Sequence, residues 1–335
     1  MRSPQSESDG GRCAASHGGL GVPCVVRADR IGDRVPAPTR GRVQSVFERA
    51  CNIETRAGEL VTLLAEGLGN IPHGIRLAGP IAPFESWLIP GQNAILDKLA
   101  LRVPDADITI DLSGAAVWRG AVVAVSMDLC LMDPGGGAIA VALRELRATL
   151  TEHAPEQGFT PLLARHANAR SSVERAFAAR LSQTLPLLAR ATERRDVRAI
   201  AGVAARLVGL GPGLTPSGDD FIAGYLAALW SRAGFENGID AMLQPLAGAL
   251  APLFLRTNAI SRQMLSDAAQ GRFAERLISV MGAVAGVGDV VDATAHALAS
   301  GHSSGADTLC GLLFGYAPDQ AARFESSAGR TAAIA

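Results

Sequence analysis

The sequence has few aromatic residues, a single lysine (Lys98) and no long apolar run. Aromatic residues make up only 4% of the 335 residues, so side chains that could stack on bases are scarce. The formal net charge is −1, and no run of basic residues marks a nucleic-acid surface. No apolar stretch approaches the ~18 residues that a membrane helix needs. We therefore expect neither a nucleic-acid partner nor a membrane span.

The five cysteines show no C-x-x-C spacing, which is the spacing typical of zinc sites. Their odd number does not favour a disulfide framework either, and the first residues are polar rather than signal-like. These features predict a reducing, cytoplasmic location. Apolar residues make up 48% and charged residues 19%, a balance typical of an enzyme-like protein with a sizeable core.

Two kinds of apolar periodicity divide the chain. Between about residues 42 and 125, short apolar segments alternate with Gly, Pro, Asn or Asp, and no helical stretch separates them. Beyond the glycine turn at 135–137 the apolar spacing becomes helical. We predict an α+β protein, with a mostly antiparallel β barrel or sandwich over 41–134 and an all-helical domain over 135–320. Residues 1–40 are predicted to be a disordered extension and 321–335 a frayed tail.

The predicted elements follow from these patterns. The predicted strands cover residues 43–47, 51–55, 59–65, 74–78, 98–103, 107–112 and 121–126. The predicted helices cover residues 138–153, 171–191, 196–208, 216–232, 239–255, 258–270, 273–281, 288–300 and 304–316.

The motif Ser-Gly-x-Asp-x-x-x-Gly occurs twice in the helical part, at residues 217–224 and 304–311. In each copy the Asp and the second Gly are four residues apart, so they share one helix face. A glycine on that face lets another backbone approach closely. Two helices packed through Gly224 and Gly311 would bring both Ser-Gly turns and their carboxylates together. The repeat therefore predicts a shared site.

A capped helix start explains part of the first motif. Thr215 suits the N-cap position, Pro216 the first helical position, and Asp219 and Asp220 the first turn. It does not explain four glycines within ten residues, which favour close approach of the backbone to a ligand or another segment. Those glycines are Gly209, Gly211, Gly213 and Gly218.

The second motif also has a structural explanation, because Ser304 and Asp307 have the spacing of a capping box. His302 next to it could transfer a proton near neutral pH, or it could be an ordinary surface group. The turn at 301–305 fits G-x-S-x-G, but a nucleophile elbow needs a preceding strand and the preceding segment is predicted to be helical. The first glycine turn lacks the lysine of a P-loop, since Lys98 belongs to the β domain.

A third polar segment begins at Arg256, whose guanidinium could hold a substrate carboxylate. Thr257 and Ser261 could line the same site, or they could simply start a helix. Clustered carboxylates and hydroxyls would suit Mg²⁺, although no motif identifies a metal ligand.

The sequences at 209–221 and 301–309, together with Thr257 and Ser261, resemble the AllH family. Its members are described as a subunit of oxamate carbamoyltransferase. The resemblance covers about residues 42–317 and leaves out the first forty. It implies a multi-subunit enzyme of allantoin and purine degradation that exchanges a carbamoyl group between oxalurate and phosphate. The implied partners are the other subunits and a small anionic amide or carbamoyl substrate.

This chemistry suits the motif residues. We hypothesise that Asp220 and Asp307 orient the carbamoyl group, that His302 assists proton transfer, and that Arg256 pairs with a substrate carboxylate. Two alternatives stay open: another acyl or carbamoyl transfer in the same site, or a non-catalytic structural or regulatory subunit whose glycine motifs serve helix packing. The predicted substrate-binding residues are Gly211, Gly213, Thr215, Ser217, Gly218, Asp219, Arg256, Thr257, Ser261, Ser303, Ser304, Gly305 and Thr308.

Overall fold

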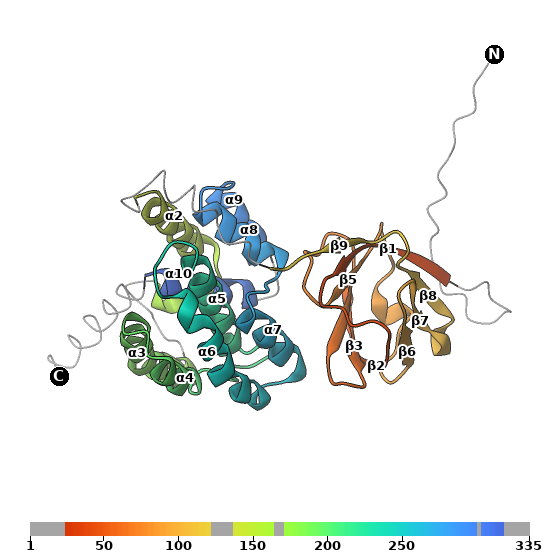
Figure 1. Ribbon diagram of the computed structural model, residues 1–335, viewed down its shortest axis with the longest axis horizontal. Helices are drawn as coiled ribbons and strands as arrows, with labels where there is room; N and C mark the ends of the chain where they lie inside the picture. Colours follow the sequence, from red (N-terminus) through yellow and green to blue (C-terminus); the bar gives the residue numbers. More distant parts are fainter. Residues whose placement is uncertain (1–23, 122–136, 164–170, 300–302, 318–335) are drawn as a thin grey trace, which may run out of the picture. The chain divides into compact units, whose positions relative to one another are not determined.

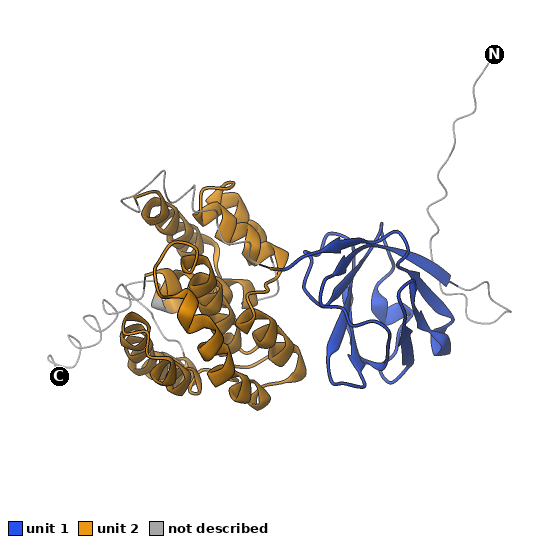
Figure 2. Ribbon diagram, viewed as in Figure 1, with its two compact units in different colours: residues 1–120 blue, residues 121–335 orange. Residues whose placement is uncertain are grey.

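The computed structural model describes residues 24–121, 137–163, 171–299 and 303–317. The chain divides into two compact units, residues 1–120 and 121–335 (Figure 2). The division therefore falls just after the last strand of the β unit, about fourteen residues before the predicted boundary, which lies outside the described residues.

The first unit is a barrel of eight strands in the order β5-β4-β3-β2-β6-β7-β8-β1, closed by the pairing of β1 with β5 (Figure 1). A ninth strand, β9, adds to β1 outside this ring. Most neighbours are antiparallel, as predicted; β1 pairs in parallel with β8 and β9, and β4 with β5. The strands are β1 (Cys24–Gly32), β2 (Thr39–Val46), β3 (Ala50–Thr55), β4 (Leu60–Leu64), β5 (Gly74–Leu77), β6 (Asn93–Leu96), β7 (Ala100–Val103), β8 (Ile108–Asp111) and β9 (Ala116–Trp118).

Alternating side chains fill the barrel. Ile108 and Ile110 are buried at 4% and 0% exposure, whereas Thr109 between them is only half-buried. Ile110 lies opposite Leu101 and Ile108 opposite Val103, so the two strands direct their apolar faces to the same side. The strand predicted at residues 107–112 is confirmed.

Strand β1 corrects the prediction that residues 1–40 are disordered. Its sequence is interrupted by charges, and Asp29 is held on the barrel by Arg76 of β5, whose guanidinium donates to both carboxylate oxygens at 3.0 and 2.6 Å. The strand is stabilised by pairing with β5, β8 and β9, which its own apolar pattern does not reveal. Strands β6 and β9 were also not predicted, and most of the predicted strand 121–126 lies outside the described residues.

The second unit is helical, and its helices match the predicted ones closely. The predicted helix 239–255 is divided into α6 and a 3₁₀ segment, and α4 ends four residues earlier than predicted. The helices are α2 (Gly137–His153), α3 (Ser172–Glu193), α4 (Val197–Ala204), α5 (Ser217–Arg232), α6 (Asp240–Leu250), η4 (Ala251–Arg256), α7 (Ala259–Ala269), α8 (Glu275–Val284), α9 (Val290–Leu298) and α10 (Ser304–Tyr316), with a further short 3₁₀ turn, η3 (Thr160–Leu162).

Helices α5 and α10 form the centre of this unit (Figure 1). Every residue of α5 except Trp230 is buried, which is typical of a helix surrounded by others. The two helices run parallel and touch through glycine. A Cβ atom on Gly224 would lie 1.8 Å from the carbonyl oxygen of Thr308, and one on Gly311 would lie 2.0 Å from that of Phe221. The prediction that these two glycines pack the motif helices together is confirmed.

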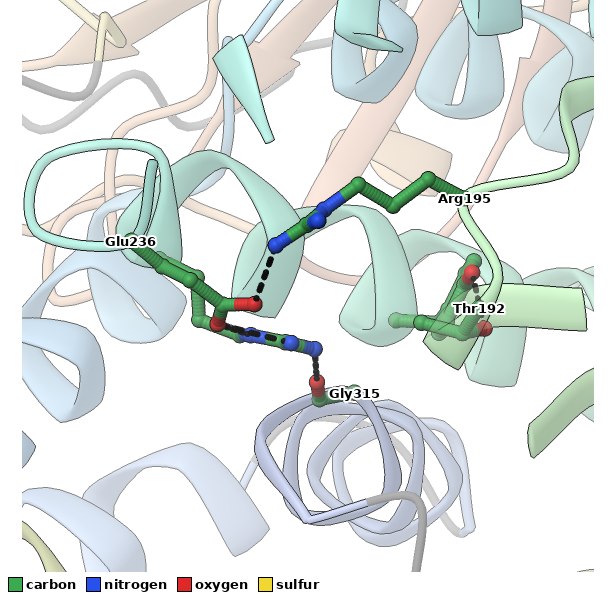
Figure 3. Close-up of polar contacts among 6 residues, drawn as sticks. Thr192, Arg195, Glu236 and Gly315 are labelled. Carbon is green, nitrogen blue, oxygen red and sulfur yellow. Dashed lines mark hydrogen bonds and ion pairs between the residues drawn. The ribbon is translucent and has the colours of Figure 1, made fainter. Parts of the chain in front are cut away.

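Polar contacts tie the other ends of the same two helices (Figure 3). The Arg232 guanidinium donates to the carbonyl oxygen of Gly315 at 2.6 Å, near the C-terminus of α10. Its Nε also donates to Glu236 at 2.8 Å, and Glu236 pairs with Arg195 at 3.3 Å. An arginine at this place satisfies a C-terminal carbonyl and complements the helix dipole. The pair is therefore fixed along its whole length.

Cys24 is disulfide-bonded, although the odd number of cysteines did not favour a disulfide framework. Cys51 and Cys310 are buried free thiols. Among the described helices, none is long and apolar enough to cross a membrane.

Replacing Gly224 by Ala should destabilise the helical unit by about 3 kcal/mol or more, because the added methyl group collides with a backbone carbonyl that cannot move independently. Gly248→Ala is the matched control, since Gly248 lies in α6 with nothing within 4 Å of its Cβ position. The control should gain about 0.5–1 kcal/mol from helix propensity. Urea unfolding followed by circular dichroism measures both; equal stability of the two variants would contradict the packing described here.

Candidate functional site

The two motifs meet at the start of α5 and α10, where Asp220 and Asp307 are both 0% exposed. A serine of each motif lies next to the aspartate of the other motif. The Ser304 hydroxyl faces Asp220, and the Ser217 hydroxyl faces Asp307. The two Ser-Gly corners are thus neighbours in space, with both carboxyl groups between them.

Both carboxyl groups resist ionisation. Burial is the main reason that the pKa of Asp220 lies well above its ordinary value; the Ser304 hydroxyl opposes this shift, and the nearby charge of Asp307 adds to it. Burial also raises the pKa of Asp307 to about 6, against the effect of the Phe159 N–H and of the Ser217 hydroxyl. Two adjacent buried carboxyl groups cannot easily both be charged. Near neutral pH the pair therefore tends to keep a proton.

Several polar atoms at this corner lack partners among the described residues. Neither carboxylate oxygen of Asp220 makes a hydrogen bond, because the hydroxyls that face it do not reach hydrogen-bonding geometry. Oδ2 of Asp307 is also buried without a partner. Elsewhere in the helical unit, Oγ of Ser261 on α7 is buried without a partner too. An unsatisfied buried group costs about 1–3 kcal/mol, so native proteins seldom keep one without a ligand, water or function.

Asp219 differs from its neighbour, because both of its oxygens are engaged. Oδ1 accepts from the Gly209 N–H at 2.7 Å, and Oδ2 accepts from the Thr257 hydroxyl at 2.5 Å. Asp219 thereby fastens the glycine loop to the segment that precedes α7. These contacts give Asp219 and Thr257 a structural task, and their predicted part in substrate binding stays a prediction.

The glycines of the first loop also have structural reasons. Gly211 has a φ of 118°, which residues with a side chain rarely adopt. A Cβ on Gly218 would lie 2.0 Å from the carbonyl oxygen of Leu207. The abundance of glycine, which favoured a ligand in the sequence, is thus explained by the path of the loop. The carboxyl pair is the stronger indication of a site.

The other predicted residues lie around this corner with different contacts. Arg256 is exposed, and its Nη1 donates to the carbonyl oxygen of Ala205 at 2.8 Å. The Thr308 hydroxyl donates within its helix to the carbonyl oxygen of Ser304 at 2.8 Å. His302, the third predicted catalytic residue, lies outside the described residues. Gly213, Thr215 and Ser303 are at least partly exposed in the loops that lead into α5 and α10, and Gly305 is partly exposed in the first turn of α10.

One further contact could not be predicted from the sequence. The backbone N–H of Phe159 donates to Oδ1 of Asp307 at 2.7 Å, across 148 residues of chain. Gly158, with a φ of 58°, packs directly on the same carboxylate. The Phe159 ring stacks on Phe221 with centroids 4.3 Å apart. In the sequence this segment is only a turn after a helix, with no motif to connect it with the aspartates.

Two family models match the chain. Oxamate carbamoyltransferase subunit AllH matches residues 207–316, and the AllH family N-terminal domain matches residues 25–117. The chain belongs to the AllH family. The AllH match contains α5, α7 and α10 with both motifs, and the N-terminal match contains nearly the whole barrel, including most of β1. The resemblance seen in the sequence began at residue 42, so it missed this first strand. No solved structure is significantly similar to the chain.

Among the described residues, no group of three or more His, Cys, Asp or Glu side chains is placed to hold a metal ion. A Mg²⁺ ion between Asp220 and Asp307 would therefore need further ligands from water, substrate or another subunit.

Asp307→Asn should stabilise the purified chain at pH 8 by up to about 3 kcal/mol, with little effect at pH 4. The pKa of Asp307 is about 6 in the folded chain and 3.8 in the reference state, so folding becomes less favourable as the pH rises between these values. An amide at this position removes the cost of a buried charge and still accepts from the Phe159 N–H. Urea unfolding across this pH range measures the difference.

Asp219→Ala is the matched control in the adjacent motif. It removes the acceptor for both Gly209 and Thr257, so the variant should be about 3 kcal/mol less stable at pH 8. Destabilisation of Asp307→Asn by a similar amount at pH 8 would show instead that Asp307 is a structural group.

Proposed function

We propose that the helical unit of this chain holds the carbamoyl-bearing substrate of an oxamate carbamoyltransferase between Asp220 and Asp307. The observation that carries the proposal is a buried pair of carboxyl groups with unpartnered oxygens. A pair that shares one proton offers one hydrogen-bond donor and one acceptor side by side. A carbamoyl group offers the complement, a carbonyl oxygen that accepts and an NH₂ group that donates.

The charge of the corner also suits small anions. Oxamate, oxalurate and carbamoyl phosphate each carry an anionic group next to the amide or carbamoyl function. Helices α5 and α10 both begin here, and the positive ends of their dipoles favour negative charge. Because the carboxyl pair keeps a proton, it repels such an anion less than two ionised aspartates would. The hydroxyls of Ser217, Ser303 and Ser304 add donors around the pair.

The reaction can be written for these groups. A phosphate oxygen attacks the carbamoyl carbon of oxalurate and forms a C–O bond. The C–N bond to oxamate then breaks, and the oxamate nitrogen takes up a proton. The protonated carboxyl group donates to the carbamoyl oxygen, where negative charge develops in the transition state. His302 stays our candidate for the proton transfer to nitrogen, and Arg256 for the substrate carboxylate.

The family description names a subunit, so we expect the active enzyme to include other subunits and to work in cytoplasmic allantoin and purine degradation. The second candidate is a non-catalytic structural or regulatory subunit. It is favoured by the structural tasks of Asp219 and the loop glycines, and by the complete burial of Asp220 and Asp307.

In the assembled enzyme, Asp220→Asn and Asp307→Asn should each reduce turnover of oxamate and carbamoyl phosphate by about 100-fold or more, since each alters a contact to the reacting group. Asp240→Asn, at an exposed position in the first turn of α6, is the control and should keep full turnover. Near-normal turnover of both site variants, with assembly intact, would favour the structural subunit instead.

Ligand protection gives a second measurement. Carbamoyl phosphate or oxamate should raise the melting temperature of the purified wild-type chain, since a ligand that binds only the folded state stabilises it. The rise should be absent in both site variants.

A further inference from the structure

The carboxyl pair lies between two nearly equivalent halves. Beyond the exchange of serines, Gly224 of the first motif packs on the carbonyl oxygen of Thr308, the residue after Asp307. Gly311 of the second motif packs on the carbonyl oxygen of Phe221, the residue after Asp220. The two motifs alone would therefore give both aspartates almost the same surroundings. A ligand that has a donor on one side and an acceptor on the other needs the two aspartates to differ.

The segment 155–163, which we call the strap, makes this difference. Its Phe159 N–H donates to Oδ1 of Asp307, and no described residue donates a hydrogen bond to Asp220 in the same way. A hydrogen bond to a carboxylate stabilises its ionised form. A buried backbone N–H is a strong donor that has no protonation state of its own to change.

The strap is held in place at both ends and within itself. Just before the strap, the Ala154 N–H donates to the carbonyl oxygen of Leu150 at 3.0 Å. At the end of the strap, Arg147 of α2 donates to the carbonyl oxygen of Leu163 at 3.0 Å. In the middle, the Thr160 hydroxyl donates to the carbonyl oxygen of Gln157 at 2.8 Å. The position of the Phe159 N–H is therefore set by the surrounding contacts.

The strap also touches both halves of the pair. The Phe159 ring stacks on Phe221 of α5, and it packs nearly perpendicular to the Phe177 ring of α3, with ring centroids 5.7 Å apart. On the other side, a Cβ atom on Gly158 would lie 2.1 Å from Oδ1 of Asp307. The backbone can approach the carboxylate so closely only because Gly158 has no side chain and tolerates a positive φ.

We infer that the strap is a positioning element of the carboxyl pair: through the Phe159 N–H it makes Asp307 the acceptor and leaves the shared proton on Asp220. The inference rests on the proposed function, because it assigns each aspartate its contact with the substrate. Asp220 donates to the carbamoyl oxygen, and the free Oδ2 of Asp307 accepts from the carbamoyl NH₂.

The charged and titratable groups near Asp307 are few in the described part of the chain. On α5, Asp220 interacts electrostatically with Asp307, and Asp219 acts in turn on Asp220. Cys310 lies one turn further along α10, and burial raises its pKa well above the ordinary value, so it stays neutral. Arg147 of α2 acts on Cys310 and holds the strap. Among these described groups, a titration near pH 6 is therefore assigned to Asp307.

The direct test is the Phe159 amide signal in a chain labelled with ¹⁵N-phenylalanine, which contains only ten such residues. If the N–H binds the ionising carboxylate, its chemical shift should titrate with a midpoint near pH 6, and the titration should vanish in Asp307→Asn. An amide signal that stays constant between pH 5 and 8 in the wild-type chain would overturn the inference. The measurement needs no substrate, so its outcome is independent of whether the proposed function holds.

Two variants distinguish the effect of the Phe159 N–H on Asp307 from the effect of the Phe159 ring. Gly158→Ala should move the titration of Asp307, followed by the pH dependence of unfolding, upward by about one pH unit, because the carboxylate loses its donor. Gly238→Ala, also at a positive φ but next to the Arg195 side chain rather than the Asp307 carboxylate, is the control and should leave the midpoint unchanged. Phe159→Leu keeps the N–H and should also leave it unchanged. An equal shift in Phe159→Leu would refute the role of the N–H.

The assignment of roles is tested in the assembled enzyme. If ionised Asp307 is required, turnover should rise with pH through about 6, and Gly158→Ala should move this rise by the same pH unit as the stability curve. An unchanged pH–rate profile, in a variant whose stability curve has moved, would show that the strap is structural only.

Discussion

The close approach of the α5 and α10 backbones is the constraint on which the site depends. Gly224 and Gly311 leave no room for even a methyl group between one helix and the carbonyl oxygens of the other. Because the helices run parallel, this contact also brings their first turns together. Asp220 and Asp307 are thereby forced into the same buried space, a place that neither would occupy for its own stability. The chemistry of the corner is a consequence of the packing of two glycines.

The buried carboxyl pair lowers the stability of this corner, and the packing of the rest of the helix pair offsets that cost. Burial raises the pKa values of both aspartates and leaves carboxylate oxygens without partners. The rest of α5 is buried among apolar side chains, and Arg232 fixes the far end of the helix pair. Unfavourable groups held in place by a well-packed surrounding are characteristic of functional sites. Asp219 illustrates the contrast, because the same residue type one position earlier has both oxygens engaged.

The sequence was informative wherever the determining contacts are local or repeated. The helix expected at 304–316 is found unchanged, and the repeated motif predicted the contact through Gly224 and Gly311 because identical spacing places identical groups on facing helices. Strand β1 was missed because its stability comes from three partner strands and from the pairing of Asp29 with Arg76. The Phe159 contact was missed because 148 residues separate donor and acceptor, and a backbone N–H leaves no trace in residue type.

The strap also bears on how a duplicated motif could serve an asymmetric substrate. Two equivalent aspartates would hold their shared proton with equal preference, so a ligand would meet donor and acceptor in either order. One backbone N–H on Asp307 removes this equivalence without a further charged group in the site. A scaffold would gain nothing from the distinction, since helix packing through the glycines is indifferent to which carboxyl group carries the proton. A carbamoyl group, whose oxygen and nitrogen are not interchangeable, requires it.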